Sequence, residues 1–161
     1  FTLANNAVNA IQGTPGSSSM IITNGTGSFV RNAVANTPVL FPVGDGGYYS
    51  PVRLTSISGT TTGTISARAE STGTLGPDFI QKYWDIVTST AGKTITAEFT
   101  YDPAEVEGTP SIIMVKPGAG SWQAPAGTQG FGSNTFTITG TTDISTTTSS
   151  WSAMGIGDFD T

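Results

Sequence analysis

The side chains that most often carry catalysis or bind transition metals are missing from this sequence. Its 161 residues include no histidine and no cysteine. This excludes Ser–His–Asp and Cys–His nucleophiles, histidine acid–base catalysis, and ordinary zinc, copper or iron–sulfur sites. The sequence also lacks a P-loop and any glycine-rich segment followed by a helix that could hold a phosphate. We therefore expect the protein to use no cofactor.

Pairs of carboxylates remain as a route to hydrolytic chemistry. Glycoside hydrolysis needs two acids that face each other across a cleft, whereas most of the 11 acidic residues lie at predicted turns. Glu70 and Glu98 lie on predicted strands, on faces that we expect to be in solvent. We interpret the acids as solvated groups and predict that the chain is not an enzyme. A glycan-active enzyme with two catalytic carboxylates is the least favoured alternative.

Two other kinds of site would use the charged residues. Asp102, Glu105 and Glu107 lie within one predicted turn and offer the oxygen ligands that calcium prefers, but they do not form a complete calcium-loop pattern. A charged turn is the simpler interpretation, so we predict no metal site. Lys82 or Lys93 could form an isopeptide bond with an Asn or Asp in an apolar pocket, as in some surface adhesins. The spacing along the sequence gives such a bond no specific support.

Aromatic side chains could form a platform that stacks on sugar rings. Trp122 lies in a predicted loop or short edge strand, and Tyr48 and Tyr49 follow a glycine-rich turn. These three residues are the candidates for glycan stacking, and ordinary packing is the alternative explanation for them. Trp84 and Trp151 lie in strongly predicted strands, so we expect them in the core.

The composition is typical of an exported protein. Charged residues make up only 11% of the chain, while 28 Thr and 17 Ser give it a polar, uncharged character. The absence of cysteine favours a bacterial exported protein or a cytosolic one. The first residue, Phe1, suggests that a leader was removed or that numbering begins inside a longer chain. Asn24 begins an Asn-Gly-Thr triplet and is the candidate glycosylation site. We therefore predict an extracellular or cell-surface location.

The charge distribution argues against two classes of partner. The net charge is −5, and the six basic residues are scattered along the chain. Without a basic stripe, nucleic acid is not an expected partner. No apolar run approaches the roughly 20 residues that a membrane-spanning helix needs, so direct membrane insertion is not expected either.

The elements that must position these residues are nearly all strands. Short alternating runs are separated by Gly, Pro, Asn and Ser, and one helical turn is expected at 103–107. The pattern predicts a single domain over 1–161, an all-β, two-sheet antiparallel sandwich of about 12 short strands. We expect 81–88 and 93–101 to form a hairpin through Ala91-Gly92, and 112–115 to be a central strand. The predicted strands are 20–23, 27–31, 39–43, 52–57, 63–69, 81–88, 93–101, 111–116, 121–123, 135–139 and 151–157.

The first 11 residues form an unusual apolar segment. Phe1 and Leu3 would share one face of an extended strand, but Val8, which follows Asn5-Asn6, would point to the opposite face. This predicts two short strands joined by a bend or bulge. Such a segment can pair within its own domain or add to the sheet of a neighbour. Residues 1–11 are thus a candidate strand-exchange segment, in which Phe1, Leu3, Val8 and Ile11 would contact the next subunit.

An ordered set of short sequence motifs resembles a known family. These motifs are GSFVR at 27–31, FPVG at 41–44, YSPV at 49–52, KYWDI at 82–86, GSW at 120–122 and WSAMGIG at 151–157. Together they resemble the extracellular β-sandwich module of large, adhesin-like proteins that Bacteroidetes-type bacteria export by the type IX route. The resemblance implies export and a sandwich fold, and it supplies no catalytic motif. Members of this family are usually one stretch of a longer chain, so this chain is either an excised module or a small self-assembling subunit.

These observations favour a structural or adhesive function. The first hypothesis is a fibre or surface-layer subunit that assembles into a homopolymer by N-terminal strand donation. The alternative is a carbohydrate-binding module of a secreted protein, which would place exposed aromatic side chains around Trp122 or around Tyr48 and Tyr49.

Overall fold

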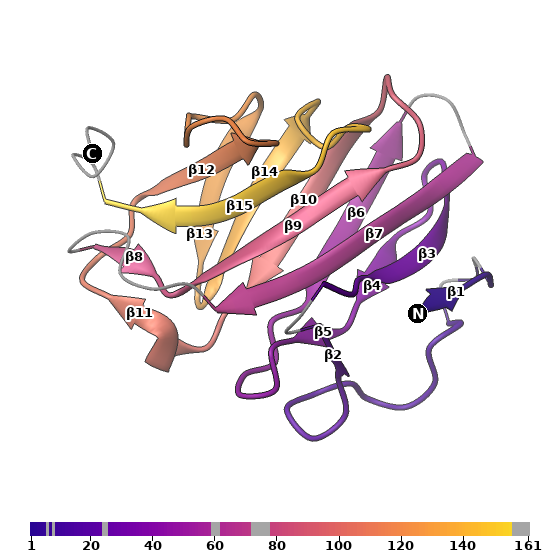
Figure 1. Ribbon diagram of the computed structural model, residues 1–161, viewed down its shortest axis with the longest axis horizontal. Coiled ribbons are helices and arrows are strands. Elements are labelled where there is room, and N and C mark those ends of the chain that lie inside the picture. Colours follow the sequence, from indigo (N-terminus) through magenta and orange to yellow (C-terminus); the bar gives the residue numbers. More distant parts are fainter. Residues whose placement is uncertain (6, 8, 24–25, 59–61, 72–77, 156–161) are drawn as a thin grey trace.

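The computed structural model is an all-β sandwich, as the sequence predicts (Figure 1). It describes residues 1–155 except for 6, 8, 24–25, 59–61 and 72–77. The one helical turn in this part of the chain is the 3₁₀ turn η1 (Pro103–Glu105), within the predicted segment. The strands are β1 (Thr2–Leu3), β2 (Ile21–Ile22), β3 (Phe29–Val34), β4 (Val39–Phe41), β5 (Val43–Gly44), β6 (Val52–Ser58), β7 (Thr62–Ser71), β8 (Phe79–Ile80), β9 (Lys82–Thr88), β10 (Thr94–Thr100), β11 (Val106–Glu107), β12 (Ile112–Pro117), β13 (Thr128–Gly132), β14 (Thr135–Thr141) and β15 (Ser149–Met154).

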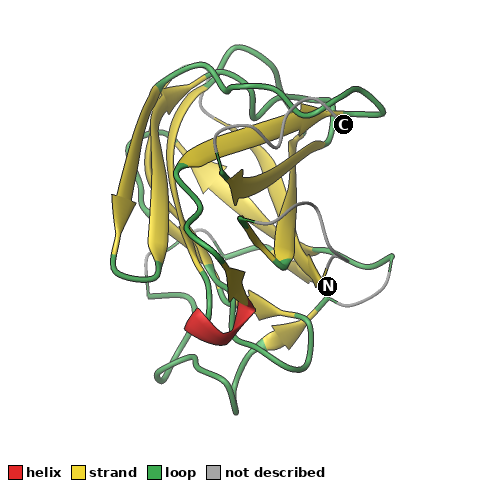
Figure 2. Ribbon diagram, turned by 90° about the vertical axis from the view of Figure 1, so that its left-hand side faces the viewer, coloured by secondary structure: helices red, strands yellow, loops and turns green. Residues whose placement is uncertain are grey.

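Two sheets form the layers of the sandwich (Figure 2). The larger sheet has the order β1-β3-β7-β9-β15-β8-β11, and β12 also pairs with β15. The smaller sheet has the order β13-β14-β10-β6-β4. Their strand pairs are antiparallel except for β1 with β3, and a separate parallel pair joins β2 to β5.

Aromatic side chains from both sheets fill the space between the layers. Trp84 on β9 and Trp151 on β15 are fully buried, as predicted, and both come from the larger sheet. Phe99 and Phe136 reach them from the smaller sheet. The Phe99 ring centroid lies 5.4 Å from that of Trp84 and 5.7 Å from that of Trp151. The alternating burial along β9 and β10 is therefore the signature of two strands whose inner faces meet in one core.

The predicted hairpin between 81–88 and 93–101 is wrong. Strand β9 pairs with β7 and β15, whereas β10 pairs with β6 and β14 in the other sheet. The chain around Ala91-Gly92 therefore crosses from one layer to the other. Both strands have a hydrophobic face, and they bury these faces by lying in opposite layers, whose inner sides pack against each other.

The prediction of 112–115 as a central strand also needs correction. Among the described residues, strand β12 has one strand neighbour, β15, although Val115 makes an isolated bridge to Gln123. Its two faces are nevertheless apolar and buried for different reasons. Ile113 and Val115 face the main core, whereas Met114 packs in a small second cluster with Phe79 and Met154. Trp122 packs against that cluster, in a segment that forms this bridge rather than the predicted strand.

Within the described residues, no helix has the length and apolar character that a membrane crossing would require.

Candidate functional site

A fully buried lysine lies at the edge of the core. Lys82 is the first residue of β9, and the alternation of that strand turns its side chain to the same face as Trp84. Its side chain is 0% exposed. The ammonium group, Nζ, lies 3.0 Å from Asp45 Oδ2 and 2.5 Å from Glu105 Oε1. A buried charge is costly unless it is paired, so these two acids are what allows a lysine here.

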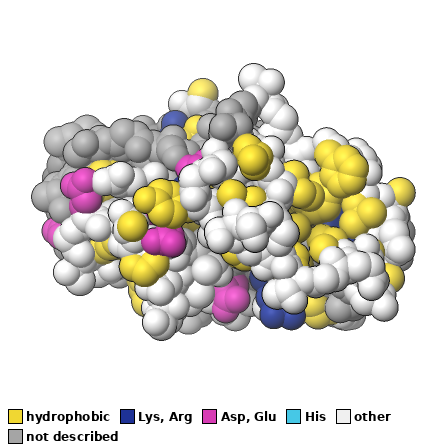
Figure 3. All heavy atoms as spheres, turned by 90° about the horizontal axis from the view of Figure 1, so that it is seen from below, with side chains coloured by type: hydrophobic (Ala, Val, Ile, Leu, Met, Phe, Trp, Pro, Cys, Tyr) yellow, Lys and Arg dark blue, Asp and Glu magenta, His cyan; other side chains and the backbone are white. Residues whose placement is uncertain are grey.

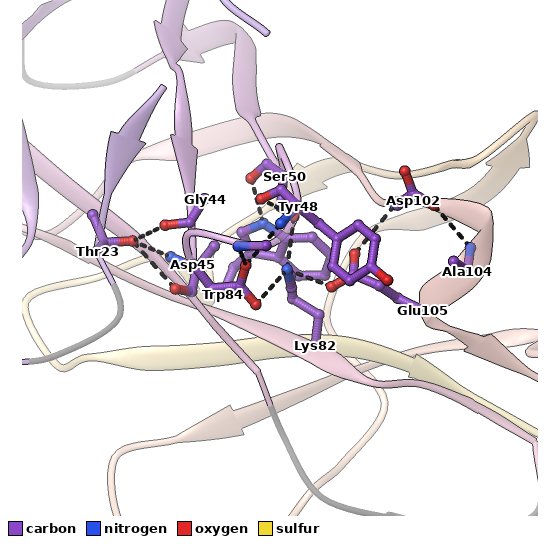
Figure 4. Close-up of polar contacts among 12 residues, drawn as sticks. Thr23, Gly44, Asp45, Tyr48, Ser50, Lys82, Trp84, Asp102, Ala104 and Glu105 are labelled. Atoms are coloured by element: carbon purple, nitrogen blue, oxygen red, sulfur yellow. Dashed lines mark hydrogen bonds and ion pairs between the residues drawn. The ribbon is translucent and has the colours of Figure 1, made fainter. Parts of the chain in front are cut away.

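Asp45 is held by the turn that follows β5 (Figure 4). Its Oδ1 accepts hydrogen bonds from the backbone N–H groups of Gly47, at 2.9 Å, and Tyr48, at 3.0 Å. Its Oδ2 accepts from Lys82. Gly46 has a φ of +93°, a conformation that residues with a side chain rarely adopt, so glycine at this position makes the tight turn possible. The two oxygens thus have separate roles, one towards the backbone and one towards the amine.

Glu105 reaches the same amine from the turn η1. Asp102 caps this turn through Ala104 N, and Asp102 N in return donates to Glu105 Oε2 at 3.2 Å. This reciprocal capping box fixes the glutamate side chain and leaves Oε1 for Lys82. Burial raises the pKa of Glu105 above its ordinary value of 4.5, the Lys82 contact partly opposes this, and the charge of Asp45 adds to the rise.

The group formed by Lys82, Asp45 and Glu105, here called the lysine cluster, is closed off by its neighbours (Figure 4). Ser50 Oγ lies 3.0 Å from Nζ, and the ring centroid of Tyr48 lies 5.5 Å from it. The indole Nε1 of Trp84 donates to Ser50 O at 2.8 Å, which ties the cluster to the aromatic core. The exposed fractions of the Asp45 and Glu105 side chains are only 7% and 4%. The cluster therefore sits in a site with little access to water.

These positions correct the interpretation of the acids as solvated groups. Asp45 and Glu105 both face a buried cation. Glu107, one residue beyond Val106, points elsewhere and accepts a hydrogen bond from Gln81 Nε2. The three acids Asp102, Glu105 and Glu107 thus do not converge, and no group of three or more metal-ligating acids is found among the described residues.

A second site lies on the outer face of the larger sheet. Tyr83 and Asp85 occupy the face of β9 opposite to Lys82, and Trp122 comes from the loop after β12. They line a groove of about 370 Å³ together with Lys116, Gly118, Thr148 and Ser150. Ser150 Oγ donates to Asp85 Oδ1 at 2.6 Å, and Lys116 Nζ lies 5.8 Å from the Trp122 ring centroid. The groove, here called the aromatic groove, combines two half-buried rings with charged and hydroxyl groups.

The structure separates the three aromatic residues predicted to bind glycans. Trp122 lines the aromatic groove, whereas Tyr48 covers Lys82 on the other face of the sheet. Tyr49 is half-buried, and burial raises the pKa of its hydroxyl. The ring that does join Trp122 is Tyr83, which sequence reasoning missed because it was assigned only to a strand. The available signal was the alternation along β9, which puts Tyr83 on the face opposite to the buried Trp84.

A third site is the N-terminal segment. Strand β1 pairs with β3, with Thr2 opposite Val30 and Leu3 opposite Arg31, and the Phe1 ring stacks on Phe29 with centroids 5.6 Å apart. Leu3 and Ile11 are partly buried against the core, while Phe1 is 76% exposed. Val8, the other predicted contact residue, and Asn24, the predicted glycosylation site, lie outside the described residues. The two predicted short strands are one, β1, followed by irregular chain among the described residues.

An apolar hollow lies beside this segment. Its volume is about 420 Å³, and its lining includes Phe1, Leu3, Ile11, Met20 and Phe29. Figure 3 shows hydrophobic side chains gathered on the face of the molecule seen from below, at the end where β1 and β2 lie. Arg31 on β3 is buried and donates from Nη2 to Ala7 O at 3.1 Å. Asn32 Nδ2 also donates to Ala4 O, at 2.7 Å. The segment is therefore held by two side chains of β3, one short strand and a few apolar contacts.

Comparison of the chain with protein-family models, curated proteins and solved structures gives no match. The resemblance to the Bacteroidetes surface module stays a prediction.

Proposed function

We propose that this protein is a non-enzymatic extracellular module that builds a bacterial fibre or surface layer by exchanging its N-terminal strand with a neighbouring copy. The observation that carries the proposal is the way β1 is attached. It stands at the end of the sheet, it pairs over two residues, and it lies beside an apolar hollow that it fills only in part.

Exchange would reproduce contacts that already exist. Residues 1–11 of one copy would pair with β3 of the next, with Phe1 on Phe29 and Ala7 on Arg31 as within one chain. Residues 12–20 would act as the hinge, and nine extended residues span roughly 30 Å. Because the contacts are the same in both forms, exchange costs little at high protein concentration, and head-to-tail exchange that does not close gives a filament.

Paired cysteines test the exchange directly, because the chain has no cysteine of its own. Thr2 and Val30 are partners in the parallel register of β1 and β3. We expect a Thr2→Cys/Val30→Cys variant, oxidised in its assembled form, to give a ladder of disulfide-linked oligomers on a non-reducing gel. Mixing the Thr2→Cys and Val30→Cys single variants should give linked dimers.

A matched pair inside the sandwich is the control. Glu98 and Thr137 are partners on β10 and β14, so a Glu98→Cys/Thr137→Cys variant should close within one chain. Deleting residues 1–11 should abolish fibres in negative-stain microscopy. Disulfides confined to single chains in the Thr2/Val30 variant, or fibres that persist unchanged after the deletion, would contradict strand exchange.

The aromatic groove favours carbohydrate binding as a second candidate function. Rings that stack on sugars and side chains that hydrogen-bond hydroxyl groups are the usual means of holding a glycan, and Trp122, Tyr83, Asp85 and Ser150 supply both. Thr148 adds a further hydroxyl. This activity is compatible with a surface fibre, because the groove and β1 lie on different parts of the larger sheet.

A glycan array followed by titration calorimetry tests this candidate. We expect Trp122→Ala and Tyr83→Ala each to weaken binding of any glycan hit by about 10-fold or more, since loss of a well-placed contact of 1.4 kcal/mol corresponds to this factor. Phe131→Ala is the matched control, because Phe131 is an aromatic residue of β13 in the other sheet and is 43% exposed. An array without signal, or binding that is equally weakened by all three changes, would remove the candidate.

A further inference from the structure

The lysine cluster contains one more acid than an ion pair needs. Lys82 Nζ is in contact with both Asp45 Oδ2 and Glu105 Oε1. If all three groups were ionised, the buried cluster would carry a net negative charge, which is unfavourable at a site closed to water. One carboxyl group is therefore expected to hold a proton. An amine that contacts both a carboxyl group and a proton-carrying acid, inside a pocket with little access to water, has the components of amide formation.

We propose that Lys82 and Asp45 become joined by an intramolecular isopeptide bond, and that Glu105 relays the protons of this reaction. The bond forms between Lys82 Nζ and the carboxyl carbon of Asp45, and Asp45 Oδ2 leaves as water. This inference does not depend on strand exchange or on glycan binding.

The carboxyl group of Asp45 is arranged for attack by the amine. Its Oδ1 accepts from two backbone N–H groups, those of Gly47 and Tyr48. These donors stabilise the negative charge that develops on Oδ1 when the amine adds to the carbon, as an oxyanion hole does. Oδ2 faces the amine at 3.0 Å. Oδ1 is therefore the oxygen that becomes the amide carbonyl, and Oδ2 is the leaving group.

Glu105 is positioned to move two protons in sequence. Its Oε1 lies 2.5 Å from Nζ, while its Oε2 is fixed by Asp102 N. The protonated Glu105 gives its proton to Oδ2 and takes one from the Lys82 ammonium in return, which leaves a neutral amine that can attack. After addition it again gives its proton to Oδ2, which departs as water, and takes a second proton from the nitrogen. One ammonium and one carboxylate thus become one amide and one water, and Glu105 ends in its initial state.

The surroundings favour the product. Holding the reacting groups in contact removes the entropy cost of bringing them together. Amide formation also removes a cation and an anion from a buried site, where their desolvation is expensive. The Trp84 indole, which fixes Ser50, and the Tyr48 ring limit access of water to the bond. The bond would fasten the turn after β5 to the start of β9, residues 37 apart in the sequence.

The intact mass of the denatured full chain tests the proposal. We expect the purified protein to be lighter than its sequence mass by one water molecule. Proteolysis followed by tandem mass spectrometry should yield a branched peptide in which the segment around Asp45 is joined to the segment around Lys82. A wild-type protein with its full sequence mass, even after prolonged incubation in the folded state, would overturn the proposal.

Three variants separate the isopeptide bond from other losses of water. An Asp-Gly sequence such as Asp45-Gly46 can also lose water by forming a succinimide, which needs no lysine. Lys82→Met should therefore restore the full mass, and water loss that persists in it would assign the change to the succinimide and overturn the proposal. Glu105→Gln keeps the shape of the side chain and should have the full mass. Glu107→Gln is its matched control, because Glu107 bonds to Gln81, and it should stay lighter by one water.

The rate and extent of bond formation in the Glu105→Gln variant test the role of Glu105 separately. Folding of the Glu105→Gln variant can be verified by near-ultraviolet circular dichroism, which reports on Trp84 and Trp151. A folded Glu105→Gln protein that forms the bond as completely and as fast as the wild type would overturn the relay. A bond formed many-fold more slowly, or not at all, supports it.

Discussion

Replacing Lys82 by alanine is expected to lower the free energy of unfolding by about 3–5 kcal/mol, because it leaves two buried carboxyl groups without their cation. Asp45 and Glu105 cannot turn to solvent easily, since backbone N–H groups hold one oxygen of each. The measurement is urea unfolding of the variant and the wild type, monitored by tryptophan fluorescence. This figure is for the loss of the charge partner, and loss of an isopeptide bond would add to it.

The loss in this variant should depend on pH in a defined direction. The folded-state pKa of Glu105 is already raised above its ordinary value of 4.5 by burial, and removal of the lysine removes the contact that opposes the rise. In the folded state the group therefore binds its proton more tightly than in the unfolded chain. Stability is retained at a pH below 4.5 and falls as the pH rises through the window between 4.5 and the raised pKa. Lys82→Ala should thus be closest to the wild type in acid.

Two further variants sharpen this prediction. Lys116→Ala removes a half-buried lysine that lies over Trp122, and we expect a change within about 0.5 kcal/mol. A Lys82→Met/Asp45→Asn/Glu105→Gln variant removes all three ionisable groups while retaining similar volumes, and it should recover much of the stability lost in Lys82→Ala. Equal losses in Lys82→Ala and Lys116→Ala would show that the cluster does not carry the stability assigned to it.

The second large effect is expected at the centre of the core. Trp84→Ala should lower the free energy of unfolding by about 3–5 kcal/mol, because it opens a cavity that its neighbours cannot fill. The Trp84 ring contacts Phe99 and Phe136, and its indole N–H is the hydrogen-bond donor to Ser50 O. Since Ser50 also contacts Lys82, the variant should loosen the lysine cluster as well.

Urea unfolding followed by circular dichroism measures this effect, since the variant lacks one of the fluorescent reporters. Phe131→Ala is the control, because it removes an aromatic ring that is 43% exposed and whose centroid lies 6.5 Å from that of Phe136. We expect it to cost about 1 kcal/mol or less. Similar losses for the two variants would mean that the stacked rings between the sheets are not the main source of stability.

The local pattern of the sequence was sufficient for the fold class and for much of the core. Alternation along β9 and β10 predicts which side chains are buried, because successive residues of a strand point to opposite faces. The burial of Trp84 and Trp151 follows from the same rule. The lack of histidine and cysteine is also a property of the sequence alone, and it limits the chemistry to carboxylates, amines and hydroxyl groups.

The pairing of strands was decided only by the tertiary structure. The link at Ala91-Gly92 is compatible with a hairpin, yet β9 and β10 lie in different sheets. The local sequence of a strand does not determine which neighbouring strand would bury more of its apolar surface, since this burial depends on where every other strand lies. For the same reason Tyr83 and Trp122 meet in one groove while Tyr48 and Trp122, with similar sequence signals, do not.

The lysine cluster shows the same division most clearly. The sequence supplies an amine at the start of a strand, an acid in a glycine-rich turn and an acid in a capped turn, and each alone is an ordinary surface residue. Their burial comes from the packing of η1 and the turn after β5 around the start of β9. The contribution of a charge to stability depends on its surroundings, and here segments far apart in the chain form those surroundings.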